Sequence, residues 1–195
     1  MDRRLQIYRE ASALILERGF AGASMSDIAV AVGLTKAGLY HFVSSKEDLL
    51  YEIMLHGMAK LEHDVIAPAL AEADPATRLE VIVRRHIRNV VGADSALRNP
   101  ISIVIDEPQG LSPERRREID ARKRRYMDLI RDTLTALQAR GVVRPELNPT
   151  VAAFTIIGTI MWVARWRRPN GRLSLDEISD QIVGNLLSGL RGPAA

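Results

Sequence analysis

Apolar residues recur every three or four positions along almost the whole chain, and strand-like alternation of apolar and polar residues is hard to find. Such spacing places apolar side chains on one face of a helix, so we expect an all-α protein of about nine helices. Their expected ranges are 4–18, 24–31, 36–42, 46–71, 79–90, 95–105, 113–140, 149–167 and 175–190.

Several of these boundaries carry sequence signals for helix ends. Ser112-Pro113 and Asn148-Pro149 each combine an N-cap residue with proline at the first helical position. Ser174 followed by Glu177 has the spacing of a capping box. The interruptions are helix stops at Gly19 and Gly141, bends or breaks at Pro68 and Pro100, and a linker at residues 73–76.

The segment from Ala23 to Leu50 is the most informative part of the chain. Its first short helix ends at Gly33, a residue that can take the left-handed conformation of a sharp turn. Thr35 is a favourable N-cap for the second short helix. Two helices joined by a glycine turn form the helix-turn-helix, which lays its second helix in the major groove of DNA. The pattern therefore predicts a DNA-reading domain.

The second short helix opens with small or polar residues, which allow it to approach base edges closely. Lys46 begins the following helix, where free backbone N–H groups attract a phosphate. The candidate DNA contacts are Ser24, Ser26, Thr35, Lys36, Ala37, Gly38, Tyr40, His41 and Lys46. The alternative interpretation is a solvated turn between two core helices.

Residues 4–50 resemble the N-terminal domain of the tetracycline-repressor (TetR) family of bacterial transcriptional regulators. The resemblance rests on Ile15, Gly19-Phe20, Ser26-Asp27-Ile28-Ala29, Gly33-Leu34-Thr35-Lys36-Ala37-Gly38-Leu39-Tyr40 and Ser45-Lys46-Glu47-Asp48-Leu49-Leu50. With Tyr40 and Lys46 kept in step, Phe42 stands where the family has His or Tyr, and Val43 where it has Phe. This departure implies a missing phosphate contact at Phe42 and lighter core packing at Val43.

The resemblance implies a helix-turn-helix DNA-binding domain at 1–48 and a helical ligand-binding and dimerisation domain at 49–195. Glycine inside the last two helices costs about 1 kcal/mol relative to alanine, and close approach of a second copy would explain it. The expected four-helix dimer interface contains Phe154, Gly158, Ile178, Ile182, Leu186 and Gly189. A two-fold homodimer would read a near-palindromic operator.

Composition adds limits on the kind of protein. A chain of 195 residues suits one or two domains. It has no cysteine, which excludes disulfides and thiolate metal sites. Its charged, amphipathic start is unlike a signal peptide, and the longest apolar run, 151–164, is shorter than a bilayer span. We expect a cytoplasmic protein with no membrane partner.

Charge is distributed unevenly along the chain. Residues 1–48 hold six basic and six acidic residues, so DNA contacts there must be local rather than a broad basic field. Residues 111–144 hold ten basic and five acidic residues. Such a cluster indicates either a solvated helix face or a site for an anionic ligand, and the solvated face is the safer interpretation.

Residues 162–171 resemble a segment of TetR-type repressors of fatty-acid or steroid breakdown, which respond to acyl-coenzyme A thioesters. The candidate ligand-binding residues are His86, Arg122, Tyr126, Met161, Trp162, Arg165 and Trp166. Each has an alternative role. The tryptophans could serve core and dimer packing, Arg122 could pair with an acid of the protein, and His86 could be a hydrogen-bonded core residue.

The sequence shows no catalytic constellation, nucleotide-binding motif or metal-ligand spacing, so we expect no enzyme activity, no cofactor and no metal. The favoured function is a ligand-responsive repressor that a small effector releases from a palindromic operator. The rivals are a multidrug- or xenobiotic-sensing TetR-type repressor, an enzyme with an appended DNA-binding domain, and a structural DNA-binding protein without an effector.

Overall fold

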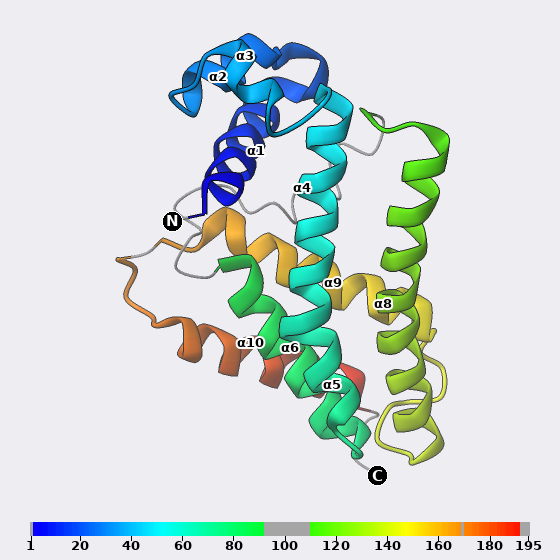
Figure 1. The fold of residues 1–195 in the computed structure, drawn as a ribbon. Coiled ribbons are helices and arrows are strands. Elements are labelled where there is room, and N and C mark those ends of the chain that lie inside the picture. The colour runs from blue at the N-terminus through cyan, green and yellow to red at the C-terminus, as the bar shows by residue number, and fades with distance from the viewer. Residues whose placement is uncertain (1, 92–109, 169, 192–195) are drawn as a thin grey trace. The chain divides into compact units, whose positions relative to one another are not determined.

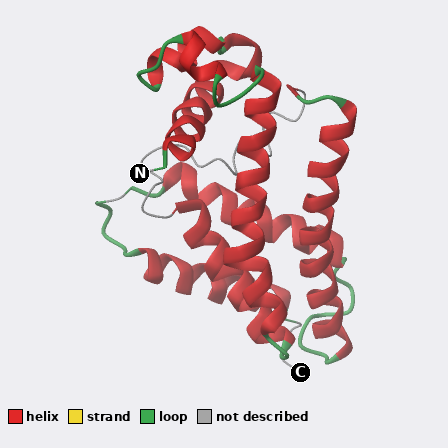
Figure 2. Ribbon diagram, viewed as in Figure 1, coloured by secondary structure: helices red, strands yellow, loops and turns green. Residues whose placement is uncertain are grey.

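The computed structural model describes residues 2–91, 110–168 and 170–191. All regular structure in these ranges is helical, which confirms the predicted fold class (Figure 2). The elements (Figure 1) are α1 Arg3–Gly22, α2 Met25–Ala31, α3 Lys36–Tyr40, α4 Lys46–Leu61, the π-helical segment η1 Glu62–Ile66, α5 Ala67–Ala71, α6 Pro75–Val91, α8 Pro113–Ala139, α9 Pro149–Trp166 and α10 Leu175–Leu190. The helix predicted at 95–105 and the break at Pro100 lie outside the described residues.

The described residues group into two compact units. The first contains residues 2–60 and 110–123, and the second contains residues 61–91, 124–168 and 170–191. Helix α8 contributes its first part to the first unit and its remainder to the second. Each unit has its own apolar core.

The core of the first unit comes mainly from α1 and α4. Its fully buried side chains include Ile7, Ala11, Ile15, Leu49, Leu50, Ile53 and Met54. Polar contacts add to this packing, because Tyr8 Oη donates to Glu52 Oε2 at 2.8 Å and Arg4 pairs with the same carboxylate at 3.2 Å. These contacts fix α1 against the helix that follows the predicted DNA-reading segment.

Gly19 interrupts α1, as predicted from the sequence. Its φ of 73° lies in the left-handed region that glycine tolerates, and the chain then continues helically to Gly22. The regular helix that begins at Arg3 therefore ends at Gly19 as predicted, and a short helical turn follows the kink.

The helical stretch predicted at 46–71 is continuous, but Pro68 changes its form. Proline lacks the N–H that would bond the Asp64 carbonyl in an α-helix. The chain is π-helical over Glu62–Ile66, just before the proline, and Arg85 Nη1 donates to Asp64 O at 3.3 Å. Arg85 of α6 thus donates to the Asp64 carbonyl, to which Pro68 cannot donate.

The second unit is built around α6, which packs against both α9 and α10. The apolar stripe predicted for α6 is confirmed, since all of its members are buried: Leu79, Ile82, Val83, His86, Ile87 and Val90. Small residues on α9, Ala152 and Ala153, are buried as well and permit close helix packing. The predicted stripe of α8 is likewise buried throughout: Ile119, Tyr126, Ile130, Thr133, Leu134 and Leu137.

The linker predicted at residues 73–76 is shorter than expected, because α6 already begins at Pro75. Asp74 accounts for this start: its Oδ2 accepts a hydrogen bond from Thr77 N at 2.9 Å, in the manner of an N-cap. This bond, together with those from the Thr77 hydroxyl and Arg140, holds the pKa of Asp74 below its usual range. Asp74-Pro75, which was interpreted as part of a linker, instead marks the start of α6.

Helix α9 is long and apolar enough, by length and composition alone, to cross a membrane. The apolar run 151–164 is shorter than this helix, whose 18 residues reach the lower end of spanning lengths. A core helix of a soluble protein meets the same criterion. In the second unit one face of α9 packs on α6.

Candidate functional sites

The turn between α2 and α3 has the geometry of a helix-turn-helix. Gly33 has φ 67°, Gly33 N donates to Val30 O at 3.0 Å, and Leu34 N donates to Ala29 O at 2.8 Å. This pair of bonds is the Schellman arrangement, which satisfies the last carbonyls of α2. The glycine that the sequence analysis singled out thus sets the angle at which the chain enters α3.

Helix α3 exposes most of its surface. Thr35 Oγ1 caps it by accepting from Gly38 N at 3.0 Å, and Leu39 is its one buried side chain. The predicted DNA contacts Thr35, Lys36, Ala37, Tyr40 and His41 are all exposed, and Gly38 is half-buried. The small-residue face expected from the sequence is therefore accessible to a DNA groove.

The two serines predicted to touch DNA lie at the start of α2. Ser24 forms a capping box with Asp27, whose Oδ2 accepts from the Ser24 amide at 3.1 Å and from its hydroxyl at 2.6 Å. These bonds hold the pKa of Asp27 below its usual range. Ser26 is exposed in the first turn of α2. Ser24 therefore has a structural role beside the predicted one.

Lys46 is engaged within the protein. Its Nζ donates to Phe20 O at 2.7 Å and lies 4.3 Å from the centroid of the Phe20 ring. The ammonium has three donors, so a phosphate contact remains compatible with this position. Val43 is buried and Phe42 is half-buried. The lighter packing at Val43 and the missing phosphate contact at Phe42 stay predictions.

Tyr40→Ala is expected to weaken operator binding by roughly ten- to a hundredfold, the loss of one hydrogen bond to a charged phosphate. The loss should be similar across operator sequences, because a phosphate contact carries no base information. Fluorescence anisotropy with labelled duplexes measures it. Tyr40→Phe, which keeps the ring and lacks the hydroxyl, should lose a similar amount. Unchanged affinity in both variants would place Tyr40 outside the DNA contact.

His86 and Tyr126 form a buried polar pair in the second unit. The Tyr126 hydroxyl and His86 Nδ1 share a hydrogen bond of 2.8 Å, and the rings meet edge to face with centroids 5.3 Å apart. Burial lowers the pKa of His86 to about 4 and raises that of Tyr126. Within the described part of the chain, His86 Nε2 is buried without a hydrogen-bond partner. The hydrogen-bonding capacity of His86 Nε2 is therefore unused among the described residues.

Arg122 is a half-buried residue of the first unit, one helical turn before Tyr126. Its guanidinium lies 3.5 Å from Glu118 on the same helix, an intrahelical acid partner of the kind considered in the sequence analysis. Its role in ligand binding stays a prediction.

The remaining ligand candidates lie at the end of α9. Trp162 and Trp166 are 64% and 48% exposed, Arg165 is exposed and Met161 is half-buried. Exposed tryptophans match the alternative of packing against a second copy of the chain.

The predicted dimer residues divide into two groups. On α9, Phe154 is 62% exposed, and a Cβ built on Gly158 would meet no atom within 4 Å. On α10, Gly189 is similarly open, Ile182 and Leu186 are half-buried, and Ile178 is buried inside the second unit. The exposed members, Phe154, Gly158 and Gly189, are accessible to another protomer.

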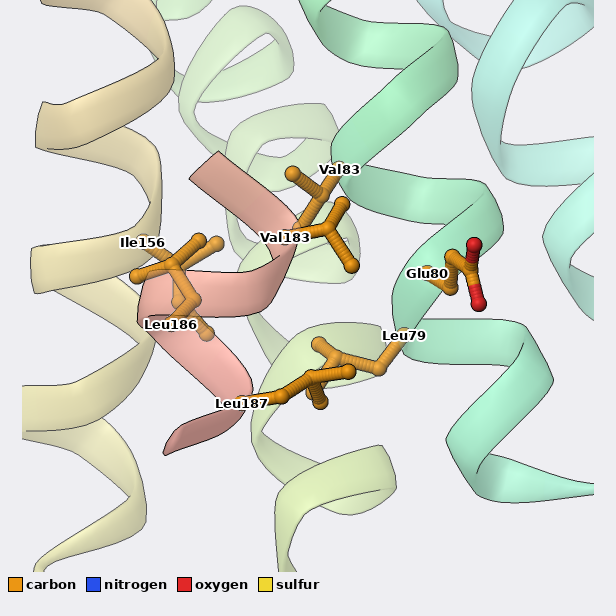
Figure 3. Close-up of a pocket in the computed structure, with 7 residues that line it drawn as sticks. All are labelled: Leu79, Glu80, Val83, Ile156, Val183, Leu186 and Leu187. Atoms are coloured by element: carbon orange, nitrogen blue, oxygen red, sulfur yellow. The ribbon is translucent and has the colours of Figure 1, made fainter. Parts of the chain in front are cut away.

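A small apolar hollow lies where α6, α9 and α10 meet, and sequence reasoning did not predict it. Figure 3 shows apolar side chains from the three helices around it, with Glu80 standing apart from them. Its lining is Leu79, Glu80, Val83, Ile156, Val183, Leu186 and Leu187, and its empty space, including the part open to solvent, is about 200 Å³. None of the ligand candidates lines it.

The basic residues at 111–144 are largely paired with acids. Arg116 pairs with Asp120, Arg131 with Asp128, Arg125 with Glu62 and Arg140 with Asp74. This favours the solvated helix face over an anion site for these arginines. Arg115 is different, because it binds acids of α4, a contact that the sequence analysis did not anticipate.

Comparison with known proteins agrees with this architecture. The family of bacterial regulatory proteins named tetR matches residues 7–53, and the tetracyclin repressor-like C-terminal domain matches residues 72–190. The HTH-type transcriptional repressor KstR2 of Rhodococcus jostii is 29% identical over 98% of this chain and 92% of its own.

Two solved structures are similar over nearly their full length. AibR, in complex with isovaleryl coenzyme A and operator DNA, is 37% identical with a TM-score of 0.83, over 95% of this chain and 98% of that one. The ketosteroid transcriptional regulator KstR2 of Mycobacterium tuberculosis is 26% identical with a TM-score of 0.85, over 98% and 96%. The chain therefore belongs to the tetR family of bacterial regulatory proteins.

Proposed function

We propose that this protein is a homodimeric transcriptional repressor whose affinity for a near-palindromic operator responds to an acyl-coenzyme A thioester. Residues 1–48 would bind DNA, and residues 49–195 would bind the effector and dimerise. The observation that carries the proposal is the exposed, small-faced helix α3 held on a Schellman turn, in a chain that matches the family over both of its parts.

The effector class is supported by the relatives together with the His86–Tyr126 pair. The AibR structure contains isovaleryl coenzyme A, and KstR2 is a ketosteroid transcriptional regulator. When the Tyr126 hydroxyl donates to Nδ1 of the neutral His86, the imidazole proton lies on Nε2, which can then donate a hydrogen bond to an uncharged acceptor such as a thioester carbonyl. The pair does not supply the buried carboxylate that a sensor of cationic drugs would use.

The effector is expected to change operator affinity by favouring one of two conformations. This requires that it binds the two conformations with different affinity. In AibR the thioester and the operator are present in one complex. We therefore expect the thioester to lower affinity for the operator without competing directly for the DNA-binding surface.

Dimerisation is supported by the outer face of α9. Val151, Phe154, Trp162 and Trp166 are large apolar residues that are 48% or more exposed on this one helix. Several large apolar side chains exposed on one helix favour an interaction site, and a two-fold interface uses the same patch on both copies. We assign this face to the homodimer interface.

A regulator of this kind acts on cytoplasmic DNA and needs no cofactor or catalytic residue. We therefore propose a cytoplasmic regulator rather than an enzyme. The direct test has two steps. An operator is first selected from random duplex DNA by the protein, and the sequence recovered should be a near-palindrome. Thioesters of increasing acyl length, starting with isovaleryl-coenzyme A, are then screened by thermal shift and by operator affinity.

Stabilisation by a thioester together with weaker operator binding supports the proposal. Stabilisation by cationic drugs and not by thioesters would favour the multidrug-sensor alternative. Tight operator binding with no response to either class would favour a DNA-binding protein without an effector.

Arg122→Met is expected to weaken binding of the thioester by roughly ten- to a hundredfold, because it removes a charged donor for the anionic ligand. Operator affinity without ligand should change far less. Isothermal titration with the thioester and anisotropy with the operator measure the two effects. Arg122→Lys, which keeps the charge, is the matched control. Equal losses of ligand and DNA binding in Arg122→Met would indicate misfolding and contradict a ligand role.

A further inference from the structure

The first turns of α8 are fastened to the first turns of α4 inside the first unit. We call this set of contacts the latch; it consists of Glu47, Asp48 and Tyr51 on the α4 side and Ser112, Arg115 and Glu118 on the α8 side. Ser112 N donates to Glu47 Oε1 at 2.8 Å, Arg115 pairs with Asp48, and Tyr51 Oη donates to Glu118.

Arg115 is the centre of the latch. Besides Asp48, its guanidinium reaches Glu47 Oε1 at 3.5 Å and lies 4.9 Å from the ring centroid of Tyr51. The pKa of Asp48 is lowered, chiefly by the Arg115 hydrogen bond, and the pKa of Glu47 is lowered, chiefly by the Ser112 amide. A single exposed ion pair contributes little, but one cation shared by two carboxylates and a ring fixes an orientation.

Gly110, which lies two residues before Ser112 of the latch, packs against Leu50 and Phe20 of the first unit. A Cβ added to Gly110 would lie 2.6 Å from Leu50 Cδ2 and 2.7 Å from Phe20 Cδ1, so the backbone entering α8 packs against these side chains with no room for a side chain of its own. Phe20 in turn binds Lys46 at the start of α4 through its carbonyl and its ring. The start of α8 therefore touches the residues that hold the first turn of α4.

Helix α8 also carries Arg122 and Tyr126, which belong to the proposed effector site. Because α8 is one helical run, Pro113–Ala139, and a helix is stiff compared with its side-chain contacts, an axial shift or rotation at one part of it would move the rest. A displacement at Tyr126 would reach Arg115, about three turns earlier, and from there the first turn of α4.

We propose that the latch couples effector binding to the position of α4 and hence of the recognition helix α3, with Arg115 as the positioning residue. This inference rests on the proposed function, because it needs an effector that binds at α8. It goes beyond that function by naming the contacts through which the effector acts on the DNA-binding part.

The test compares Arg115→Gln with the wild type, using an operator selected from random DNA by the wild type and isovaleryl-coenzyme A as the probe. In Arg115→Gln, affinity for operator alone and for thioester alone should stay within about threefold of wild type. The ratio of operator Kd values with and without thioester should fall at least about fivefold toward one. Arg115→Lys, which keeps a cation beside Asp48, should restore most of that ratio.

Arg116→Gln is the matched control. Arg116 is the next residue on α8 and pairs at 3.7 Å with Asp120 of its own helix, so its loss removes a charge without touching the latch. Tyr51→Phe removes only the phenol oxygen that binds Glu118 and serves as a second latch variant should Arg115→Gln fold poorly. An unchanged ratio in Arg115→Gln and Tyr51→Phe, or the same fall in Arg116→Gln, would overturn the coupling role.

Hydrogen–deuterium exchange separates failure of the latch from failure of the proposed effector. Without any ligand, amides of residues 49–53 should exchange faster in Arg115→Gln than in wild type, and not in Arg116→Gln. Faster exchange supports the latch even where the wild type ignores the thioester, a result that would contradict the effector class instead. Equal exchange in all three proteins would overturn the latch regardless of the effector.

Discussion

Leu39→Ala is expected to destabilise the first unit by about 2–5 kcal/mol and to abolish measurable operator binding. Helix α3 has five residues, and Leu39 is its one buried side chain, with no exposed surface. A helix this short has no independent stability, so its orientation depends on that anchor and on the cap at Thr35. Truncating the anchor leaves a cavity and frees the helix that must enter the groove.

Urea unfolding monitored by circular dichroism gives the stability change, and anisotropy gives operator affinity. Val30→Ala is the matched control, because Val30 is an apolar residue of α2 that is 79% exposed and supports no packing. Its stability should change by less than about 0.5 kcal/mol. If Leu39→Ala bound the operator as tightly as the control, α3 would not be the recognition helix.

The helical architecture could be predicted because its determinants are local. The cap at Thr35, the capping box of Ser174 with Glu177 and the turn at Gly33 act within a few residues, and the structure contains each of them. The π-helical segment could not be predicted. Its cause is partly tertiary, since the carbonyl left by Pro68 is bound by Arg85 from another helix.

The candidate sites were predictable to the extent that single residues reveal them. His86 and Tyr126 could be placed on buried helix faces, but their hydrogen bond joins residues 40 positions apart and has no sequence signal. Glu47 and Asp48 were interpreted as acids suited to a helix N-terminus. Their contacts with Ser112 and Arg115 depend on how α8 meets α4, which composition does not determine.

Acidification from pH 7.5 to 4.5 is expected to remove about 2–3 kcal/mol of stability through His86 alone. Burial lowers the pKa of His86 from 6.5 to about 4 in the folded protein. Below pH 6.5 the unfolded chain takes up a proton that the folded chain refuses, so protonation favours unfolding. The contribution is complete above the unfolded pKa and is lost progressively as the pH falls toward 4.

Urea titrations at the two pH values measure this contribution when wild type is compared with His86→Phe. The variant keeps an aromatic ring but leaves the buried Tyr126 hydroxyl without its partner, so it should lose about 1–3 kcal/mol at pH 7.5. Its further loss on acidification should be smaller than that of wild type by about 2–3 kcal/mol, because the titrating group is gone. Parallel losses in both proteins would mean that His86 is accessible to protons in the folded state. That result would also remove the argument that a neutral His86 is held ready for an uncharged group of the effector.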